Sequence, residues 1–353
     1  MANRYWVGGT ASWNGTAGTK WSTTSGGAGG QAEPTSSDDV FFDGNSGVVT
    51  VTRDSGISNA NNLNFTGFTG TFAGANDTQV FGNFTLGSGM TYSFTGNLNL
   101  VNLTTYSITT NGVSISSGLL FGGGDESGGG TCTVQDDITC TGVIQITKGT
   151  FNANNKNITC QSMQSSGTAT RTINMGSGTW TMTGAVNWSC TGATGLTLNA
   201  NTSTIKLTDA TSSTKTFGGN GYTYNNLWIT GAGTGAYIIA GSNTFADFKI
   251  DTPPHTVSFT AGTTQTVSTF TVNGSSGNLI TLQSTSAGSA WTLSKSSGTI
   301  SVTYCSIKDS TGTGGAIFNA NDGTSVNVSG NSNWNFALSS VLGLCFFYSL
   351  LYK

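Results

Sequence analysis

The chain has few of the residues from which most catalytic and nucleic-acid-binding sites are built. Its 353 residues include 12 Lys and Arg, 15 Asp and Glu, one His and three Pro, and charged residues make up 8% of the total. Globular domains average roughly 25% charged residues. The cations do not cluster, whereas a surface that follows phosphates needs clustered Lys and Arg. We therefore expect no nucleic-acid partner.

Cysteine is too sparse for a disulfide framework or a metal site. Six Cys are spread over the chain, none in a Cys-x-x-Cys pair, and the single His limits mixed ligand sets. The sequence therefore predicts no zinc site, no other metal and no cofactor.

Neither end shows a secretion signal or a full membrane span. The start, "MANRYWVGG", lacks the charged region and apolar core of a signal peptide, which predicts folding in a cytoplasm. The uncharged run at 337–352, "ALSSVLGLCFFYSLLY", has 16 residues, whereas a spanning helix needs ~20. We favour burial of this tail against another chain or against this chain's own end, with a membrane anchor as the alternative.

Short bursts of β-branched and aromatic residues, separated by Gly, Asn and Ser, fill the chain after about residue 40. Low charge with much Ser, Thr and Asn is also found in disordered chains. A net charge of only −3 and 10% aromatic residues argue against disorder here. Such bursts predict short strands in an all-β protein, and no window has helical spacing of apolar residues.

The strands recur at a period of about 20 to 22 residues. This period predicts a right-handed parallel β-helix, or β-solenoid, in which each coil stacks on the one before and like residues form columns. The period fails between Leu98, Val113 and Ile138, and the Gly-rich segment 121–130 is expected to be a loop that leaves the stack. The matched positions are Leu63 with Phe84, Leu227 with Phe248 and Phe270, and, in "DDITC" and "KNITC", Ile138 with Ile158 and Cys140 with Cys160.

The segment 255–274, "HTVSFTAGTTQTVSTFTVNG", illustrates one such coil. Val257 and Phe259 alternate with hydroxyl residues and are expected to point inward. Val267 is out of phase with Phe270 and Val272, so the sequence predicts a corner near Ser268 and Thr269.

We divide the chain into an N-terminal capping or attachment segment (1–44), a parallel β-helix (45–336) and an apolar tail (337–353). The first coil of a solenoid would expose its core and backbone edge, so it needs a cap. Trp6, Trp13 and Trp21 are expected to plug this end; stacking on sugars is their alternative role.

His255 is the one histidine, and a catalytic role would require a carboxylate and a nucleophile beside it. Asp251 is near in sequence, but Ser and Thr are everywhere and discriminate nothing. We interpret His255 as a turn residue.

Paired acids are the next candidates, because glycoside hydrolysis needs two carboxyls ~5–9.5 Å apart across a groove. Neighbours in a strand point to opposite faces, so the sequential pairs would not converge on one sugar. A polysaccharide lyase would also need a Lys or Arg base, and Arg171 is far from every pair in sequence. We interpret these acids as solvated turn residues and predict no catalytic residue; no binding residue is assigned. The pairs are Asp38 with Asp39, Asp125 with Glu126, Asp136 with Asp137, and Asp247 with Asp251.

The two cysteines of the repeated pentapeptide have a structural interpretation. If "DDITC" and "KNITC" lie in successive coils, Cys140 stacks on Cys160. Buried free thiols behave as small hydrophobes. The spacing therefore predicts a Cys140–Cys160 contact in the core and not a metal site.

Two regions resemble predicted bacteriophage virion and appendage proteins. They are the start, "RYWVGGTASWNGTAGTKWSTTSGGAGGQAEPTSSDDVFFD", and the stretch from "TRTINMGSGTWTMTG" through "YNNLWITG" and "YCSIKDSTGTGGAIFNA" to "NWNF". The resemblance covers most of the chain, although residues 45 to about 150 match only in their general residue pattern. It implies a β-helical tail fibre, spike or head fibre, and it brings no catalytic motif.

From this resemblance we expect a structural virion protein, not an enzyme, that contributes to attachment to host-surface glycans. Its expected partners are other virion proteins, host glycan and further copies of itself, most simply as a trimer. It would assemble in the host cytoplasm and be displayed on the outer surface of the particle. The alternatives are a β-helical polysaccharide depolymerase and an exported bacterial surface adhesin, although an adhesin ordinarily has a secretion signal.

Overall fold

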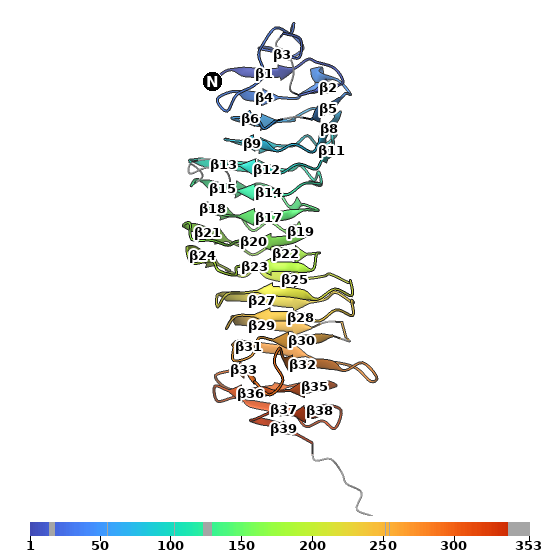
Figure 1. Cartoon of the computed structure of the whole chain (residues 1–353), viewed down its shortest axis with the longest axis vertical. Helices are drawn as coiled ribbons and strands as arrows, with labels where there is room; N and C mark the ends of the chain where they lie inside the picture. Colours follow the sequence, from blue (N-terminus) through green and yellow to red (C-terminus); the bar gives the residue numbers. More distant parts are fainter. Residues whose placement is uncertain are drawn as a thin grey trace, which may run out of the picture.

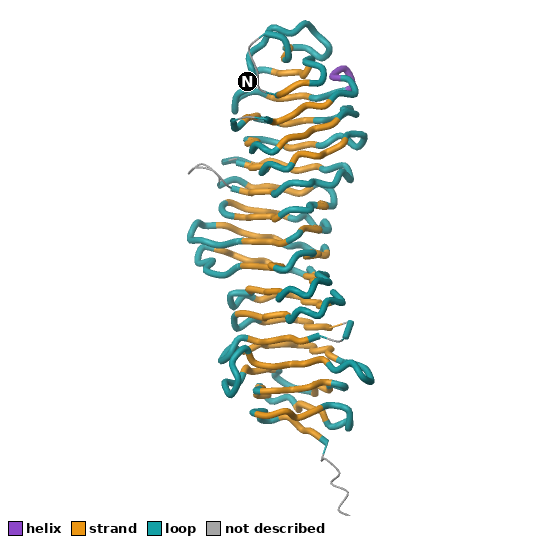
Figure 2. The backbone as a smooth tube through the Cα atoms, turned by 45° about the vertical axis from the view of Figure 1, so that its right-hand side comes forward, coloured by secondary structure: helices purple, strands orange, loops and turns teal. Residues whose placement is uncertain are grey.

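The computed structural model describes residues 1–13, 18–54, 56–101, 103–122, 129–250, 252–253 and 255–337. Over these residues the chain winds into an elongated parallel β-solenoid of about 13 turns (Figure 1). The tube view shows strands on successive levels joined by short turns (Figure 2). The only helical segment of the described residues is η1 (Gly44–Ser46), so none of their helices is long enough to cross a membrane. The predicted all-β solenoid is confirmed.

Two sheets form opposite parts of the upper wall. The ten-stranded sheet contains β3 (Trp21–Ser22), β1 (Asn3–Trp6), β4 (Asp39–Phe41), β7 (Leu63–Asn64), β10 (Phe84–Thr85), β13 (Thr105–Thr109), β15 (Thr131–Val134), β18 (Gly149–Asn152), β21 (Arg171–Asn174) and β24 (Leu196–Asn199). The four-stranded sheet contains β2 (Ala11–Ser12), β5 (Thr50–Arg53), β8 (Thr71–Gly74) and β11 (Thr91–Phe94).

A third sheet follows the axis through most of the molecule. This thirteen-stranded sheet contains β6 (Ser58–Ala60), β9 (Thr78–Val80), β12 (Leu98–Leu100), β14 (Leu119–Phe121), β17 (Val143–Ile146), β20 (Ser162–Gln164), β23 (Val186–Ser189), β26 (Lys215–Gly218), β28 (Tyr237–Ala240), β30 (Thr256–Phe259), β32 (Ile280–Ser284), β35 (Cys305–Lys308) and β38 (Val326–Ser329).

Two further sheets complete the lower part. The nine-stranded sheet contains β16 (Ile138–Thr139), β19 (Ile158–Cys160), β22 (Thr179–Met182), β25 (Thr204–Leu207), β27 (Thr223–Ile229), β29 (Thr244–Ile250), β31 (Thr264–Val272), β33 (Trp291–Ser294) and β36 (Ser310–Thr313). The three-stranded sheet contains β34 (Thr299–Ser301), β37 (Ile317–Ala320) and β39 (Trp334–Phe336). Within the described residues, every strand pair except β1 with β3 is parallel.

The register confirms the columns that the sequence period predicted. Leu63 pairs with Phe84, Leu227 with Phe248, Phe248 with Phe270, and Ile138 with Ile158. Stacked like residues form the core: the Phe248 and Phe270 rings lie 5.3 Å apart at 17°. Inward residues alternate with outward ones along most strands, as in β5, so a narrow apolar interior extends along the axis.

The coils are more variable in length than predicted. Paired residues on successive coils are 19 apart at Cys132 and Phe151, 24 apart at Phe84 and Ile108, and 28 apart at Gln265 and Leu293. Insertions at the corners absorb the difference without breaking the ladders, because only the strands must remain in register. The period failed between residues 98 and 138 for another reason: Leu98 and Ile138 lie in different sheets and Val113 lies in no strand, whereas Leu98 pairs with Leu119, 21 residues further on. The centre of the Gly-rich loop, residues 123–128, lies outside the described residues, as does the tail from residue 338.

The corner predicted at Ser268 and Thr269 is present. Both residues are exposed and adjacent in β31, whereas Val267 and Phe270 on either side are buried. The strand bends there while its pairing with β29 continues on both sides. Val257 and Phe259 point inward, as expected.

Aromatic rings plug the N-terminal end of the solenoid. Trp6 and Trp13 are fully buried, and Trp21 is 3% exposed. Each contacts Phe42, with ring centroids 5.3–5.8 Å apart. The predicted plug is confirmed, and burial leaves none of the three rings free to stack on a sugar. The 1–44 boundary itself stays a prediction, since β1 and β4 continue the ten-stranded sheet.

The Phe248 column allows a test of the stacked core. Phe248→Ala should lower the free energy of unfolding by about 3–5 kcal/mol, because it opens a cavity between two coils. Thr266→Ala, on the outward side of β31, should change it by less than about 0.5 kcal/mol. Urea unfolding with hydrogen exchange of the β29 and β31 amides measures both. Equal losses would contradict the assigned core.

Candidate binding groove

The acids of the central doublet bind two different neighbouring coils. Asp136 accepts hydrogen bonds from the Thr110 backbone N–H at 2.8 Å and the Thr110 hydroxyl at 3.1 Å. Asp137 accepts from the backbone N–H of Asn157 at 2.8 Å and from its side-chain amide at 2.9 Å. The hydrogen bonds from Asn157 lower the pKa of Asp137. The two carboxylates therefore fasten coils together and do not converge on one groove.

The N-terminal doublet is used in the same way. Asp38 accepts from the Thr35 backbone N–H at 3.0 Å and hydroxyl at 2.9 Å. Burial is the largest single influence and would raise the pKa of Asp38, but the hydrogen bonds from Thr35 and Ala2 together with the charge of Arg4 lower it. Asp39 Oδ1 accepts from the side-chain amides of Asn61 and Asn62, both at 2.7 Å. Asp38 lies in a bend, as expected, whereas Asp39 begins strand β4, and both carboxylates accept hydrogen bonds from protein groups.

Of the remaining predicted acids, only Asp247 lies within the described residues. Asp247 accepts from the Trp228 indole N–H at 3.1 Å. Asp125, Glu126 and Asp251 lie outside the described residues. Among the residues that are described, no three His, Cys, Asp or Glu side chains gather as a metal site would require.

Three cations point into the solenoid, and sequence reasoning missed their role. Arg53 donates to the carbonyl oxygens of Gly56 at 2.8 Å and Asp77 at 3.2 Å. Arg171 donates to Ala169 O at 2.6 Å and Ser165 Oγ at 2.6 Å. Both are 1% exposed or less. These guanidinium groups satisfy carbonyls at coil corners, where the regular ladder stops.

Lys215 is the third of these inward-pointing cations, and the His255 ring lies near it. The Lys215 ammonium donates to Thr211 O at 2.5 Å, is 3.7 Å from Asp209 Oδ1 and lies 5.3 Å from the Tyr237 ring centre. The His255 ring packs edge-on against Tyr237 at 5.6 Å.

His255 immediately precedes β30 but is only 3% exposed, so it is more buried than a turn residue would be. Neither ring nitrogen has a hydrogen-bond partner among the described residues. Burial, together with the charge of Lys215, lowers the pKa of His255 to about 4. The ring is therefore neutral at physiological pH and serves packing.

The cysteine column follows the predicted register. Because Ile138 pairs with Ile158 and Thr139 with Thr159, Cys140 lies one coil from Cys160. Both thiols are buried, and burial raises the pKa of Cys140 to about 11. Cys160 continues the column to Met182, with the sulfur atoms 3.7 Å apart. Protonated thiols in an apolar column are core residues.

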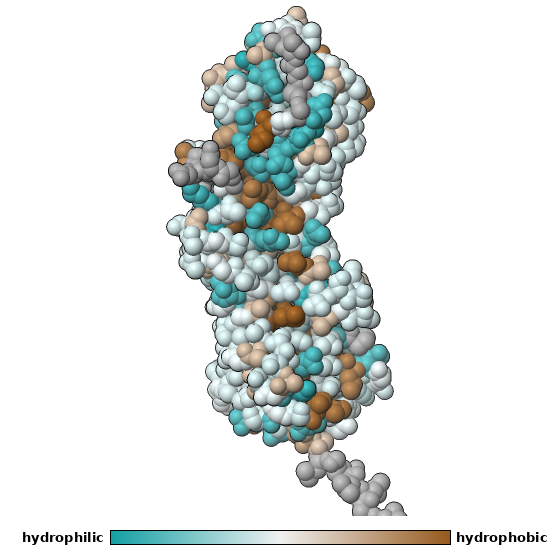
Figure 3. Space-filling view, viewed as in Figure 1, coloured by the Kyte–Doolittle hydropathy of each residue, from teal (hydrophilic) through white to brown (hydrophobic). Residues whose placement is uncertain are grey.

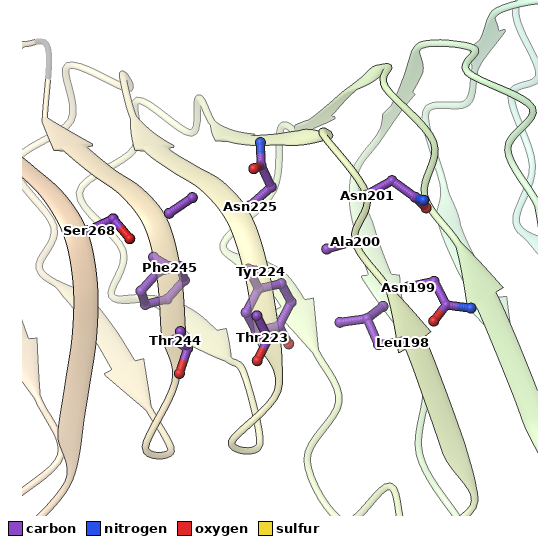
Figure 4. A pocket seen from close by; sticks show the side chains of 11 residues that line it. Leu198, Asn199, Ala200, Asn201, Thr223, Tyr224, Asn225, Thr244, Phe245 and Ser268 are labelled. Atoms are coloured by element: carbon purple, nitrogen blue, oxygen red, sulfur yellow. The ribbon is translucent and has the colours of Figure 1, made fainter.

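The feature most like a binding site is a surface hollow at the C-terminal ends of β18, β21 and β24. It has a volume of about 830 Å³. A second hollow of about 540 Å³ adjoins it and continues over β27, β29 and β31 (Figure 4). They share Asn199 and Asn201, and we call the combined surface the asparagine groove. Six asparagines line its first part: Asn152, Asn154, Asn155, Asn174, Asn199 and Asn201.

A change in coil cross-section produces this groove. The ten-stranded sheet ends at β24, and the strands of the nine-stranded sheet lengthen from four residues in β25 to seven in β27. The wall is stepped where one strand pattern replaces the other. Tyr224 and Phe245, both at most 2% exposed, lie beneath the second part.

The outward face beside the groove carries two columns of neutral polar side chains. One is a threonine column on β13, β15, β18, β21 and β24: Thr105, Thr131, Thr150, Thr172 and Thr197. The other, two residues further along each of the last three strands, is Asn152, Asn174 and Asn199. Sequence reasoning missed this pattern, although it is written as "TFN", "TIN" and "TLN" at spacings of 22 and 25.

Comparison with known proteins supplies no relative for this arrangement. No protein-family model matches the chain, no curated protein is similar to it, and no solved structure matches it. The functional argument therefore rests on the fold, the groove and the sequence resemblance described above.

His255 makes stability depend on pH. Its pKa is lower in the folded chain (about 4) than its ordinary value of 6.5. The unfolded chain therefore binds a proton first as the pH falls from 6.5 to 4, and this costs the fold roughly 2–3 kcal/mol, with no further loss from this group at lower pH. His255→Phe should abolish this component in urea unfolding measured across that range. An unchanged difference between pH 7 and pH 4 would contradict the assignment.

Proposed function

We propose that this chain is a structural component of a bacteriophage particle: a rigid β-solenoid fibre, spike or decoration that also attaches to the host surface. The unbroken coil-on-coil stack is the observation that carries the proposal. The proposal that the particle is a bacteriophage rests on the sequence resemblance to phage virion and appendage proteins.

Stiffness supports a role as a stalk. One sheet of thirteen parallel strands extends through most of the molecule, and each coil is bonded to both neighbours. At about 4.8 Å per coil, 13 turns give a rod ~60 Å long. Bending it would strain several ladders at once, so the rod can hold a binding surface away from a particle.

The surface supports display outside a cell. Most of the face in Figure 3 has intermediate hydropathy, with apolar residues in separate patches. With 8% charged residues in the chain, solubility depends on hydroxyl and amide groups. Such groups exchange hydrogen bonds with sugar hydroxyls without requiring charge neutralisation.

The two ends of the rod differ, which supports assembly with other chains. The N-terminal end is closed by the tryptophan plug. At the other end, β36, β38 and β39 are the last strands of their sheets among the described residues. Ile317, Val326 and Val328 are 54%, 45% and 49% exposed there. Unpaired strand edges beside exposed apolar side chains favour contact with other virion proteins or with further copies of this chain, as in a trimer.

The rival functions have less support. A depolymerase needs two carboxyls facing one sugar, whereas Asp38, Asp39, Asp136 and Asp137 each accept hydrogen bonds from other protein groups. An exported bacterial adhesin would share the fold and the polar surface, and the location of the protein separates it from a virion component.

Purified particles test the proposal. Mass spectrometry of gradient-purified phage particles should detect peptides of this chain at a fixed ratio to the major capsid protein. Antibody labelling in electron microscopy should place it on the outside. Recovery of the chain in the cell envelope and not in particles would contradict the virion role and favour the adhesin.

A further inference from the structure

We propose that the asparagine groove binds a neutral polysaccharide chain that lies along the solenoid axis. The inference rests on the proposed function in that a displayed fibre meets host glycans, and it adds the site and the class of sugar. It stands on four observations: the chemistry of the lining, the placement of the asparagines, their unused amide groups and the length of the groove.

The lining selects for uncharged, hydroxyl-rich ligands. Neither hollow is lined by a charged side chain. Primary amides donate and accept hydrogen bonds, which matches sugar hydroxyls, while an acidic polymer would need Arg or Lys partners. Leu198 and Ala200, both partly buried, add a small apolar patch for the C–H face of a sugar ring.

Backbone geometry explains only half of the six asparagines. Asn154, Asn155 and Asn201 have φ values of 52°, 61° and 50°, a left-handed conformation that Asn tolerates well. Asn152, Asn174 and Asn199 lie within strands at negative φ, where Asn is disfavoured. Their presence in three successive coils therefore needs another reason.

The strand asparagines retain unused hydrogen-bonding groups. Asn199 donates its amide to Asn174 Oδ1 at 2.7 Å, which leaves Asn199 Oδ1 and Asn174 Nδ2 without partners among the described residues. Asn152 Oδ1 accepts from the Asn154 backbone at 3.0 Å, and its Nδ2 is likewise unused. Two unused donors, on Asn152 and Asn174, and one unused acceptor, on Asn199, thus follow one another along the axis at the spacing of the coils.

The length of the groove favours a polymer over a single sugar. It crosses strands of six coils, from β18 to β31, which is ~24 Å at about 4.8 Å per step. Figure 4 shows Asn199, Asn201 and Asn225 around the second hollow: Asn199 ends β24, Asn201 lies in the turn that follows, and Asn225 lies in β27 of the next coil. A polysaccharide laid along this line contacts one coil after another.

A purely structural amide ladder is the competing explanation, and the chain contains a matched control for it. Asn335 donates to Asn319 Oδ1 at 3.0 Å between β39 and β37, and neither residue lines the groove. As in the groove pair, the acceptor is half-buried and the donor exposed. If both pairs serve only to join coils, removing either pair should have the same effect on glycan binding and on Tm.

The test compares Asn174→Ala/Asn199→Ala with Asn319→Ala/Asn335→Ala in the full chain. Binding to dextran, mannan and a neutral galactan, with polygalacturonate as the acidic comparison, is measured by glycan microarray and calorimetry. The unaltered chain should bind at least one neutral polymer, with little dependence on salt. The groove variant should weaken that binding at least about tenfold, the effect of one or two lost hydrogen bonds. The control variant should bind normally, and both should have similar Tm values.

Three outcomes overturn the inference. Equal loss of binding in both variants would mean a general structural effect. Binding of polygalacturonate alone would exclude a neutral ligand. If no neutral polymer binds the unaltered chain, the groove is not a site of this class, while detection of the chain in particles would still uphold the fibre.

Discussion

Backbone hydrogen bonding between parallel, in-register coils is the interaction on which the rest of this structure depends. The backbone N–H and C=O groups of each coil form hydrogen bonds with those of the neighbouring coils. A residue change in one coil therefore affects the packing of the next. Like residues are then stacked on like residues, as in the Phe248–Phe270 column. Wherever the ladder stops, at a corner or an end, some other group must satisfy the backbone, and most of the polar side chains described above serve that purpose.

The need to satisfy backbone groups where the ladder stops explains what the few charged side chains of this chain do. Asp136 and Asp137 bind the amides of adjacent coils, and Arg53 and Arg171 bind corner carbonyls from inside. A charge committed to a turn is not free to form a catalytic pair or an electrostatic surface. The exterior is consequently left largely to Thr, Ser, Asn and Gly, so the hydrogen-bonding groups it presents are mainly hydroxyls and amides.

The groove follows from the same geometry. Coils of unequal length can share one set of ladders, provided that the additional residues lie at corners. Where the ten-stranded sheet ends at β24 and the longer strand β27 takes over, the outline of the coil changes and the surface is hollowed. In the proposed function, binding takes place where the repeat is least regular, while the regular part supplies stiffness.

The sequence by itself determined the all-β solenoid, the columns of Leu63, Ile138 and Phe248, the corner at Ser268, and the tryptophan plug. These depend on alternation and spacing, which are local properties of the chain. Only the tertiary structure decided the coil lengths, the inward course of Arg171 and Lys215, the burial of His255 and the groove at Asn199. Those features depend on which corner lies above which, and residues 19 to 28 positions apart become neighbours only after the intervening turns are folded.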